Sequence, residues 1–355
     1  MSVYTHSLSP FFIEVSQGIG LRWYGLSYIA AFIFATFIIK WKIKNSESLL
    51  KIKDVSDFVY FAAFGILIGG RLGYCLFYAP HLFLQWSPSF PFWGILELHK
   101  GGMASHGGLL GVIAACYFYA KKKQLNFLHL VDLASLSAGV GLFFGRLANF
   151  INGELYGRAC VEACYFGVRF PQELYRWLQE MPSKLNLLAP LVEKMSNDNI
   201  GIPGQKITAE IWNSLVAELT SQSASISSSA QYKISLWINK IITLSESSNP
   251  LVIQHLSILT VRYPSQIFQA LLEGLLVFIL CFFIWKKPRP VGFITGCFGL
   301  FYSIARIIGE AYRMPDLGVG FQWLGLTRGQ WLSIAFIAIS LTFLLFSIRT
   351  KQKTL

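Results

Sequence analysis

An arginine, two asparagines and a glutamate stand together at the end of a long apolar segment of this chain. Residues 145–158 contain Arg146, Asn149, Asn152 and Glu154. In hydrocarbon, such side chains are costly unless they pair with one another or line a wet cavity. Arg146 and Asn149 are spaced i, i+3, so they share one face of a helix. The run therefore predicts a polar functional site.

A histidine in a glycine-rich segment is a second candidate for chemistry. Residues 101–108 read GGMASHGG, and His106 precedes an apolar stretch. Glycines let a backbone or a ligand approach closely, and free N–H groups at a helix start favour anions. Imidazole accepts a proton near neutral pH, so His106 is a candidate general base. The alternatives are that His106 only caps the helix and that the glycines only allow close helix packing.

Three arginines within apolar segments would make a shared cavity cationic. They are Arg71, Arg146 and Arg306. A guanidinium group binds phosphate oxygens in a bidentate manner, and a phospholipid headgroup is the obvious anion in a membrane. Glu310 follows Arg306 at i+4, so it either fixes that guanidinium or neutralises it. Snorkelling to lipid phosphates without a function is the alternative, above all for Arg71.

The composition indicates that membrane-spanning helices carry these residues. Of the 355 residues, 54% are hydrophobic and 14% are charged, whereas soluble domains carry about 25% charged residues. A lone segment in lipid must satisfy its own backbone, which selects the α-helix. We therefore predict an all-α integral membrane protein with seven spans of suitable length, the third being short and glycine-rich. The predicted spans are 23–39, 55–78, 105–120, 130–151, 266–285, 291–312 and 329–348.

Clusters of basic residues predict the orientation of these spans. Lysines and arginines follow the first, third, fifth and last spans, and all four clusters fall on one side if the spans alternate. The positive-inside rule makes that side cytoplasmic, so the N-terminus is expected outside and the C-terminus inside. The net charge of +12 is thus mostly a topology signal, and no nucleic-acid partner is predicted. Some of these lysines are expected to bind anionic membrane lipids.

The predicted organisation has four parts. Residues 1–158 hold the first four spans, 159–263 form a small helical head on the outer side, 264–348 hold the last three spans, and 349–355 form a cytoplasmic tail. Within the head, apolar residues at i+4 spacing from Ile207 to Leu219 predict an amphipathic helix. The serine-rich residues 221–229 are expected to be a flexible linker.

The six cysteines do not show a spacing typical of zinc sites, so no metal site is predicted. Four of them lie in apolar spans and are expected to pack there. Cys160 and Cys164 lie just outside the fourth span. We expect free thiols in preference to a disulfide, because a disulfide bridge demands a specific geometry.

The unusual polar residues fall at one depth when they are placed by helix rise. At 1.5 Å per residue, six of them lie about 22–30 Å from the cytoplasmic end of their span. They are Tyr24, Arg71, His106, Arg146, Gln266 and Arg306. Independent placement would scatter them, so the shared level predicts one cavity that opens toward the outer leaflet. For Tyr24, which follows a tryptophan, the alternative is an aromatic-belt anchor.

The motifs resemble the signatures of the prolipoprotein diacylglyceryl transferase family, in order, from the first predicted span to the last. The most specific is GR-x-ANFIN-x-E-x-x-G at 145–157. The others are WYGL at 23–26, GGRLGY at 69–74, SHGGL at 105–109, R-x-x-x-E at 306–310, R-x-P-D at 313–316 and GQ-x-LS at 329–333.

The resemblance implies a lipid-transfer reaction. Members transfer the diacylglyceryl group of phosphatidylglycerol to the lipobox cysteine thiol of a prolipoprotein, which forms a thioether and releases glycerol phosphate. The resemblance also implies a multi-pass enzyme of the bacterial inner membrane whose active site faces the outer leaflet, with no metal or organic cofactor. Since the thiolate is the nucleophile and an anion leaves, a base and cationic groups are both required.

The resemblance also implies roles for individual residues. His106 is the expected base, with Tyr24 as an alternative or assisting group, and Arg146 and Arg306 are expected to bind the phosphate and stabilise the leaving group. Together these four are the expected catalytic residues. The residues expected to bind phosphatidylglycerol are Arg71, Arg146, Asn149, Asn152, Glu154, Gly157, Gln266, Arg306 and Glu310.

The chain departs from the family pattern at the start of the fifth span. Where the family has His-Pro-Ser-Gln-x-Tyr-Glu, residues 263–269 read YPSQIFQ. Tyr263, Phe268 and Gln269 thus replace a histidine, a phenol and a carboxylate. The predicted head is also longer than in a typical member, and its extra length is expected to help dock lipoproteins.

Two other functions are compatible with a cationic membrane cavity. A transporter of anionic lipids would show inverted repeats or paired broken helices near the midplane, and the sequence shows neither. A lipid-binding scaffold without catalysis would not need His106.

Overall fold

The computed structural model describes residues 3–16, 19–45, 48, 50–97, 101–161, 164–219, 224–315 and 320–350. The chain forms two compact units. The first unit combines Met1–Leu26, Arg146–Gln269 and Ile308–Arg328. The second unit combines Ser27–Gly145, Ala270–Ile307 and Gly329–Leu355.

Six helices in the described part of the chain are long and apolar enough to cross a membrane, so this is a multi-pass membrane protein. They confirm six of the predicted spans as helices. They are α1 (Trp23–Lys44), α2 (Val55–Phe77, after the short η1 at Ile52–Asp54), α4 (Phe127–Ile151), the run of α10 (Ser265–Gln269), η7 (Ala270–Leu276) and α11 (Val277–Ile284), α12 (Phe293–Tyr312) and α13 (Arg328–Thr350). Of these, α1, α4 and α13 are longer than predicted, and the ends of the other three differ by one or two residues. Residues 351–355 of the predicted tail lie outside the described residues.

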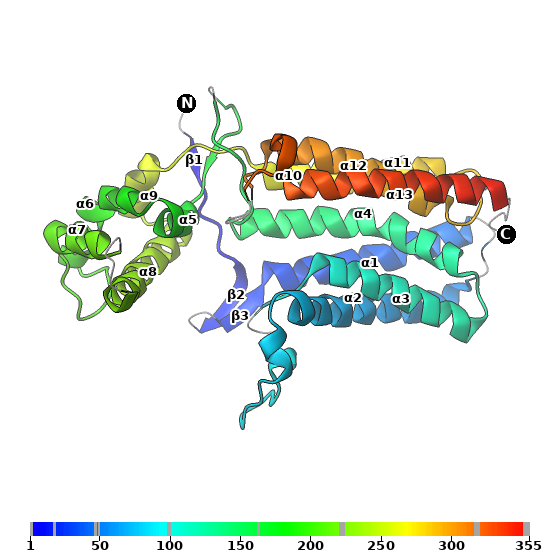
Figure 1. Ribbon diagram of the computed structural model, residues 1–355, viewed down its shortest axis with the longest axis horizontal. Helices are drawn as coiled ribbons and strands as arrows, with labels where there is room; N and C mark the ends of the chain where they lie inside the picture. The colour runs from blue at the N-terminus through cyan, green and yellow to red at the C-terminus, as the bar shows by residue number, and fades with distance from the viewer. Residues whose placement is uncertain are drawn as a thin grey trace. The chain divides into compact units, whose positions relative to one another are not determined.

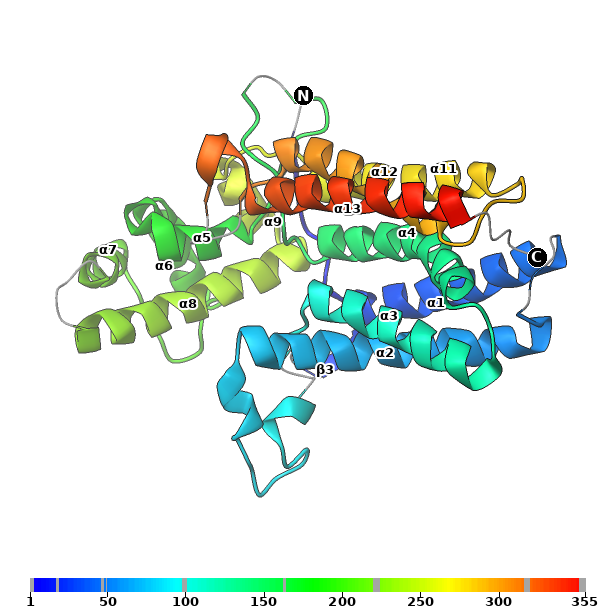
Figure 2. The ribbon, with the colours of Figure 1, turned by 45° about the vertical axis from the view of Figure 1, so that its right-hand side comes forward.

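The third predicted span is a helix, α3 (Ser105–Lys123), but it is not among the six apolar helices. Its first turns are rich in glycine and its last three residues are lysines, which shortens the apolar stretch. In both views α3 lies beside α2 (Figures 1 and 2). A Cβ atom built at Gly73 would lie 2.8 Å from the Cα of Gly107, so the two helices pack backbone against backbone.

In the second unit, a buried carboxylate fixes the start of α12. Asp132 of α4 is fully buried, and it accepts hydrogen bonds from the backbone N–H groups of Gly292 and Thr295 and from the Thr295 hydroxyl. A carboxylate satisfies the free N–H groups and favours the positive end of the helix dipole. The same helix carries Arg306.

The first unit contains a helical cluster between α4 and α10. Its elements are α5 (Glu173–Glu180), η5 (Pro182–Leu188), α6 (Ala189–Asn197), α7 (Ala209–Glu218), α8 (Ala224–Glu246), α9 (Pro250–His255) and η6 (Leu256–Ile258). Three fully buried tryptophans, Trp177, Trp212 and Trp237, anchor its core. The amphipathic helix expected near 207–219 is present as α7, which the Thr208 side chain caps.

The prediction of a flexible serine-rich linker at residues 221–229 is wrong for the residues that the structure describes. Residues 224–229 belong to α8, while 221–223 lie outside the described residues. Serine costs little in a helix compared with glycine or proline. The fully buried Ala230, Ile234 and Trp237 that follow anchor α8 in the core, so packing outweighs the local preference.

The fold is mostly helical, as expected of an all-α membrane protein, and it also contains short strands that were not predicted. In the first unit, β1 (Tyr4–Thr5) pairs in parallel with β4 (Val168–Arg169), and β2 (Phe11–Ser16) pairs antiparallel with β3 (Ile19–Arg22). The β1–β4 pair joins segments that are far apart in the chain, so no local sequence pattern predicts it. The described residues are otherwise mostly helical.

Cys160 and Cys164 form a disulfide, which corrects the expectation of free thiols. Their Cα atoms lie 6.1 Å apart, within the range that a bridge requires. The chain folds back here, since the Cys160 N–H donates to the carbonyl of Val261 and the Gly167 N–H donates to that of Cys164. The other four cysteines are buried and free, as expected.

Candidate active site

A hydrogen-bond network in the first unit joins Tyr24, Asn149, Glu154 and Gln266. The buried Asn149 amide donates to the Tyr24 hydroxyl and, over 2.8 Å, to the Glu154 carboxylate. The Gln266 amide donates over 2.7 Å to the backbone carbonyl of Glu154. The network draws on three segments that are far apart in the sequence. The fold therefore brings these four residues together.

The end of α4 gives Glu154 its position. Gly153 adopts φ of +65°, a conformation that favours glycine at a helix C-terminus. The Glu154 N–H then donates back to the carbonyl of Asn149. This turn explains why the two side chains of the signature can meet. Arg146 lies half-buried in the last two turns of the same helix.

Several buried amide atoms of the first unit have no hydrogen-bond partner among the described residues. They are the side-chain oxygens of Asn152, Gln172 and Gln266, and both polar atoms of Gln269. The Gln266 and Gln269 side chains are fully buried. Since buried polar groups are nearly always bonded, these atoms are candidates to bind polar groups of a substrate. Sequence reasoning proposed Asn152 and Gln266 for this role but treated Gln269 only as a departure from the family pattern.

Gly157 is a junction between three segments of the first unit. Its N–H donates to the carbonyl of Tyr263, and its own carbonyl accepts from Arg262 over 3.2 Å. A Cβ atom there would lie 2.8 Å from the carbonyl oxygen of Tyr312, so a larger residue would push the segments apart. These contacts give Gly157 a structural reason to be glycine.

An ion pair that the sequence analysis missed supports this junction. Arg262 donates to both carboxylate oxygens of Glu173, at 2.9 and 2.8 Å, and both side chains are buried. Burial by itself raises the pKa of Glu173, but hydrogen bonds from Arg262 and Thr260 outweigh it and hold that pKa below its ordinary value. The pKa of Arg262 is raised, because the same bonds outweigh its burial. The two charged residues are 89 positions apart in the sequence, so no local spacing predicts that they pair.

Glu310 lies in a polar cluster of the first unit. Its buried carboxylate accepts from Arg313 over 3.0 Å and from the Thr327 hydroxyl over 2.9 Å. Arg158 donates over 3.2 Å to its backbone carbonyl. These contacts tie the end of α12 to the segment that follows the signature. A pairing of Glu310 with Arg306 stays a prediction.

In the second unit, the guanidinium of Arg71 is surrounded by backbone carbonyls. The side chain is 5% exposed. Its three nitrogens donate to the carbonyl oxygens of Gly94, Ile95, Glu97, Gly101 and Gly102. These bonds tie the loop before α3 to α2. They occupy the nitrogens that a phosphate would need, so the geometry favours a positioning role over the predicted phosphate contact.

His106 is the second residue of α3 and is exposed. Its ring lies 5.3 Å from that of Phe77 and 5.8 Å from that of Tyr78. The Ala104 N–H, just before the helix, donates to the carbonyl of Gly70 over 2.9 Å. The start of α3 is thus held by the neighbours of Arg71, which places His106 on a fixed helix end.

Arg306 pairs with a carboxylate that sequence reasoning did not select. Its guanidinium donates to both oxygens of Glu273, at 3.2 and 3.3 Å, and Glu273 is fully buried. Glu273 lies in η7, a π-helical turn, and such turns often occur at functional sites. A signal was available, because a carboxylate inside an apolar span is by default a functional candidate. The single cavity predicted from the shared depth stays a prediction.

Comparison with known proteins decides the family. The family model described as prolipoprotein diacylglyceryl transferase matches residues 10–346. The chain is 44% identical over 337 residues to the phosphatidylglycerol--prolipoprotein diacylglyceryl transferase of Bdellovibrio bacteriovorus, covering 95% of this chain and 92% of that protein. This chain belongs to the prolipoprotein diacylglyceryl transferase family.

Further members are similar over the same length. The protein of the same name from Idiomarina loihiensis is 33% identical over 347 residues, covering 98% of this chain and 95% of that protein. The one from Neisseria gonorrhoeae is 30% identical over 336 residues, covering 95% and 94%. Membership in the family therefore extends to both units and confirms the resemblance found in the sequence.

Proposed function

We propose that this member of the prolipoprotein diacylglyceryl transferase family transfers the diacylglyceryl group of phosphatidylglycerol to the lipobox cysteine thiol of prolipoproteins. Family membership over nearly the whole chain supports the proposal. The single observation in the structure that carries it is the network of Tyr24, Asn149 and Glu154, because it joins the first-span motif to the central signature. Phosphatidylglycerol, prolipoproteins and membrane lipids are the partners.

The proposed reaction displaces a phosphate ester with sulfur. The thiol gives its proton to a base, and the sulfur attacks the diacylglyceryl carbon that carries the phosphate oxygen. A C–S bond forms, the C–O bond breaks, and its electron pair leaves on the phosphate oxygen of glycerol phosphate. Both a proton acceptor and a cationic environment for the leaving anion lower the barrier.

The proposed roles follow from chemistry and position. His106 is the base, because an exposed imidazole on a fixed helix end can meet a substrate thiol. Tyr24 assists, held by the Asn149 amide. Arg146 and Arg306 bind the phosphate and then the leaving anion, with Glu273 orienting Arg306. Asn152, Gln266 and Gln269 offer unsatisfied amide atoms to polar groups of the substrates.

Seven spans remain the proposed topology, with α3 as the span that is not strongly apolar. The close α2–α3 packing supports it, since α3 then buries its glycine face against a neighbour and not in lipid. Seven spans also keep all the lysine clusters on the cytoplasmic side of a bacterial inner membrane. Residues 159–263 then form an outer head, and we propose that this head docks lipoproteins.

The test of this function compares the parent protein with His106→Gln and Arg146→Ala in phosphatidylglycerol vesicles with a lipobox peptide. The parent is expected to add one diacylglyceryl group to the peptide, seen by mass spectrometry. Both variants should lose at least about 100-fold in rate while they stay folded. A protein whose lipid binding falls with Arg146→Ala, but which never alkylates the peptide, would instead be a binding scaffold.

A further inference from the structure

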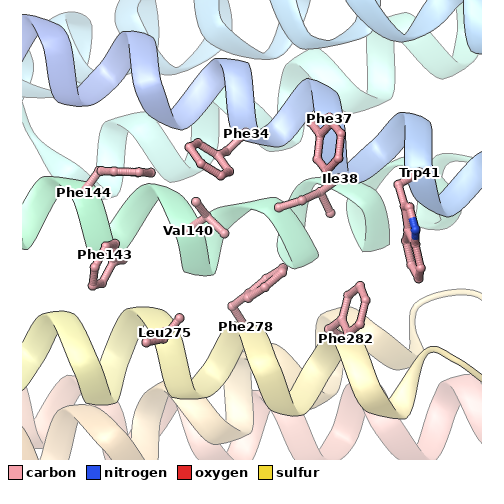
Figure 3. Close-up of a pocket in the computed structure, with 10 residues that line it drawn as sticks. All are labelled: Phe34, Phe37, Ile38, Trp41, Val140, Phe143, Phe144, Leu275, Phe278 and Phe282. Carbon is pink, nitrogen blue, oxygen red and sulfur yellow. The ribbon is translucent and has the colours of Figure 1, made fainter.

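An apolar groove of about 410 Å³ lies among three membrane-spanning helices of the second unit (Figure 3). It is lined by Phe34, Phe37, Ile38 and Trp41 of α1, by Val140, Phe143 and Phe144 of α4, and by Leu275, Phe278 and Phe282 of η7 and α11. Every one of these side chains is aliphatic or aromatic. The groove can therefore take a hydrocarbon but offers little to a polar ligand.

Glycines set the backbone spacing beside this groove. A Cβ atom at Gly274 would lie 2.6 Å from the backbone nitrogen of Phe143, and one at Gly139 would lie 2.9 Å from the Cβ of Phe278. α4 and the η7–α11 helix thus touch backbone to backbone along one side. Phe143 and Phe278, the residues that these glycines approach, both line the groove.

One end of the groove is closed by an aromatic pair. The rings of Trp41 and Phe282 stack with their centroids 4.8 Å apart and their planes 30° apart. Figure 3 shows both at the same end of the groove. The residue after Trp41, the largely buried Lys42, donates to the backbone carbonyl of Trp285 and lies over its ring at 4.7 Å. Lys42 is not among the residues that line the groove, so its charge is directed to Trp285 at this end.

We propose that this groove holds one acyl chain of the phosphatidylglycerol donor, and that the Trp41–Phe282 stack limits the length of the chain. The inference rests on the proposed transferase function and specifies its substrate. From Phe34 to Trp41 the groove runs along about 10 Å of helix. That is a large part of the roughly 15 Å that one leaflet's tails occupy in a hydrocarbon core of about 30 Å.

The position of the headgroup contact supports this occupant. Glu273, which holds Arg306, precedes the groove residue Leu275 by two positions in η7. A lipid whose phosphate meets Arg306 therefore has the start of an apolar path on the helix that carries Glu273, the partner of Arg306. The polar pair and the closing stack thus mark two ends of that path, one suited to a headgroup and the other to a methyl terminus.

The experiment measures kcat/KM for phosphatidylglycerols that differ only in acyl-chain length. In an enclosed site, a methylene that the pocket cannot accommodate lowers kcat/KM about tenfold or more. Because this groove lies beside lipid, we expect a smaller decrease in kcat/KM, of about threefold. Trp41→Ala should shift the preferred donor toward longer chains, and Val140→Phe should shift it toward shorter ones. Phe64→Ala removes an aromatic ring that is 63% exposed on α2 outside the groove, and it should leave the profile unchanged.

A second readout does not depend on turnover. A phosphatidylglycerol with a photoreactive diazirine at its chain end should crosslink to peptides containing Trp41 or Phe282, and an excess of unlabelled phosphatidylglycerol should suppress this. Equal length profiles in the parent, Trp41→Ala and Val140→Phe would overturn the inference, as would crosslinks spread over all lipid-facing helices. Absence of transfer by the folded parent would instead overturn the proposed function, whatever the crosslinks show.

Discussion

Arg71 of the second unit and Gln269 of the first unit are both buried polar side chains at motifs of the family, yet their surroundings differ completely. Arg71 donates to five backbone carbonyls, whereas neither polar atom of Gln269 has a partner among the described residues. A satisfied buried group stabilises the fold, and an unsatisfied one costs stability until something binds it. The comparison separates groups that hold the site together from groups that are free to recognise a substrate.

The largest expected effect concerns a satisfied pair. Glu173→Ala should lower the free energy of unfolding by about 3–5 kcal/mol, because it leaves the Arg262 charge buried without its partner. The control is Glu180→Ala, which removes a surface ion pair with Arg176 at 2.6 Å and should cost less than about 1 kcal/mol. Denaturant or thermal unfolding in detergent measures both. Equal losses of unfolding free energy in the two variants would contradict the assignment of Glu173 and Arg262 as a buried, stabilising ion pair.

Arg71→Met should be the next largest change. It removes the donors to the loop before α3, and we expect a loss of about 2–4 kcal/mol in stability from several unmade bonds. The rate of transfer should fall through kcat, since His106 loses its fixed support, with little change in KM for phosphatidylglycerol. A variant that keeps its stability but shows a raised KM would instead make Arg71 a phosphate ligand, as the sequence alone predicts.

A buried histidine adds a pH test to the first unit. Burial lowers the pKa of His6 to about 4, and its ring packs against those of Phe150 and Phe170. Because the folded pKa lies below the unfolded value near 6.5, the unfolded chain binds more protons as the pH falls. Stability should therefore drop by about 2 kcal/mol between pH 7 and pH 5. His6→Phe should flatten this slope, and an unchanged slope would rule out His6 as its source.

Gln269→Leu should show the smallest effect, and it acts on function alone. Removing an unsatisfied buried amide should leave stability equal or slightly higher. The transfer rate should fall about tenfold if the amide binds substrate, which corresponds to about 1.4 kcal/mol. Gln269→Glu, which restores the acid usual in the family, should keep more activity than Gln269→Leu. If Gln269→Leu lowers stability without lowering the transfer rate, Gln269 stabilises the fold and does not bind substrate.

The sequence predicts what local patterns and composition encode. Apolar length predicts the membrane helices, and i, i+3 spacing predicts that Arg146 and Asn149 share a face. The family motifs also marked Tyr24, Asn149 and Glu154 as site candidates, and the structure joins these three side chains in one network. These features depend on a short window or on a pattern shared with relatives.

Features that depend on distant partners were not predicted. The Arg306–Glu273 and Arg262–Glu173 pairs and the β1–β4 ladder join residues that only the tertiary fold brings together. The serine-rich start of α8 and the Cys160–Cys164 bridge were predicted wrongly, since packing and chain reversal outweighed local preference there. A one-dimensional pattern does not contain these contacts.

The most direct test of lipid transfer is a stoichiometry. The protein in phosphatidylglycerol vesicles is given a lipobox peptide, and both the alkylated peptide and the released glycerol phosphate are quantified. We predict equal amounts of the two products, with the diacylglyceryl group on the cysteine sulfur and neither product from a peptide with serine at that position. Folded protein that releases no glycerol phosphate and alkylates no peptide would contradict the account.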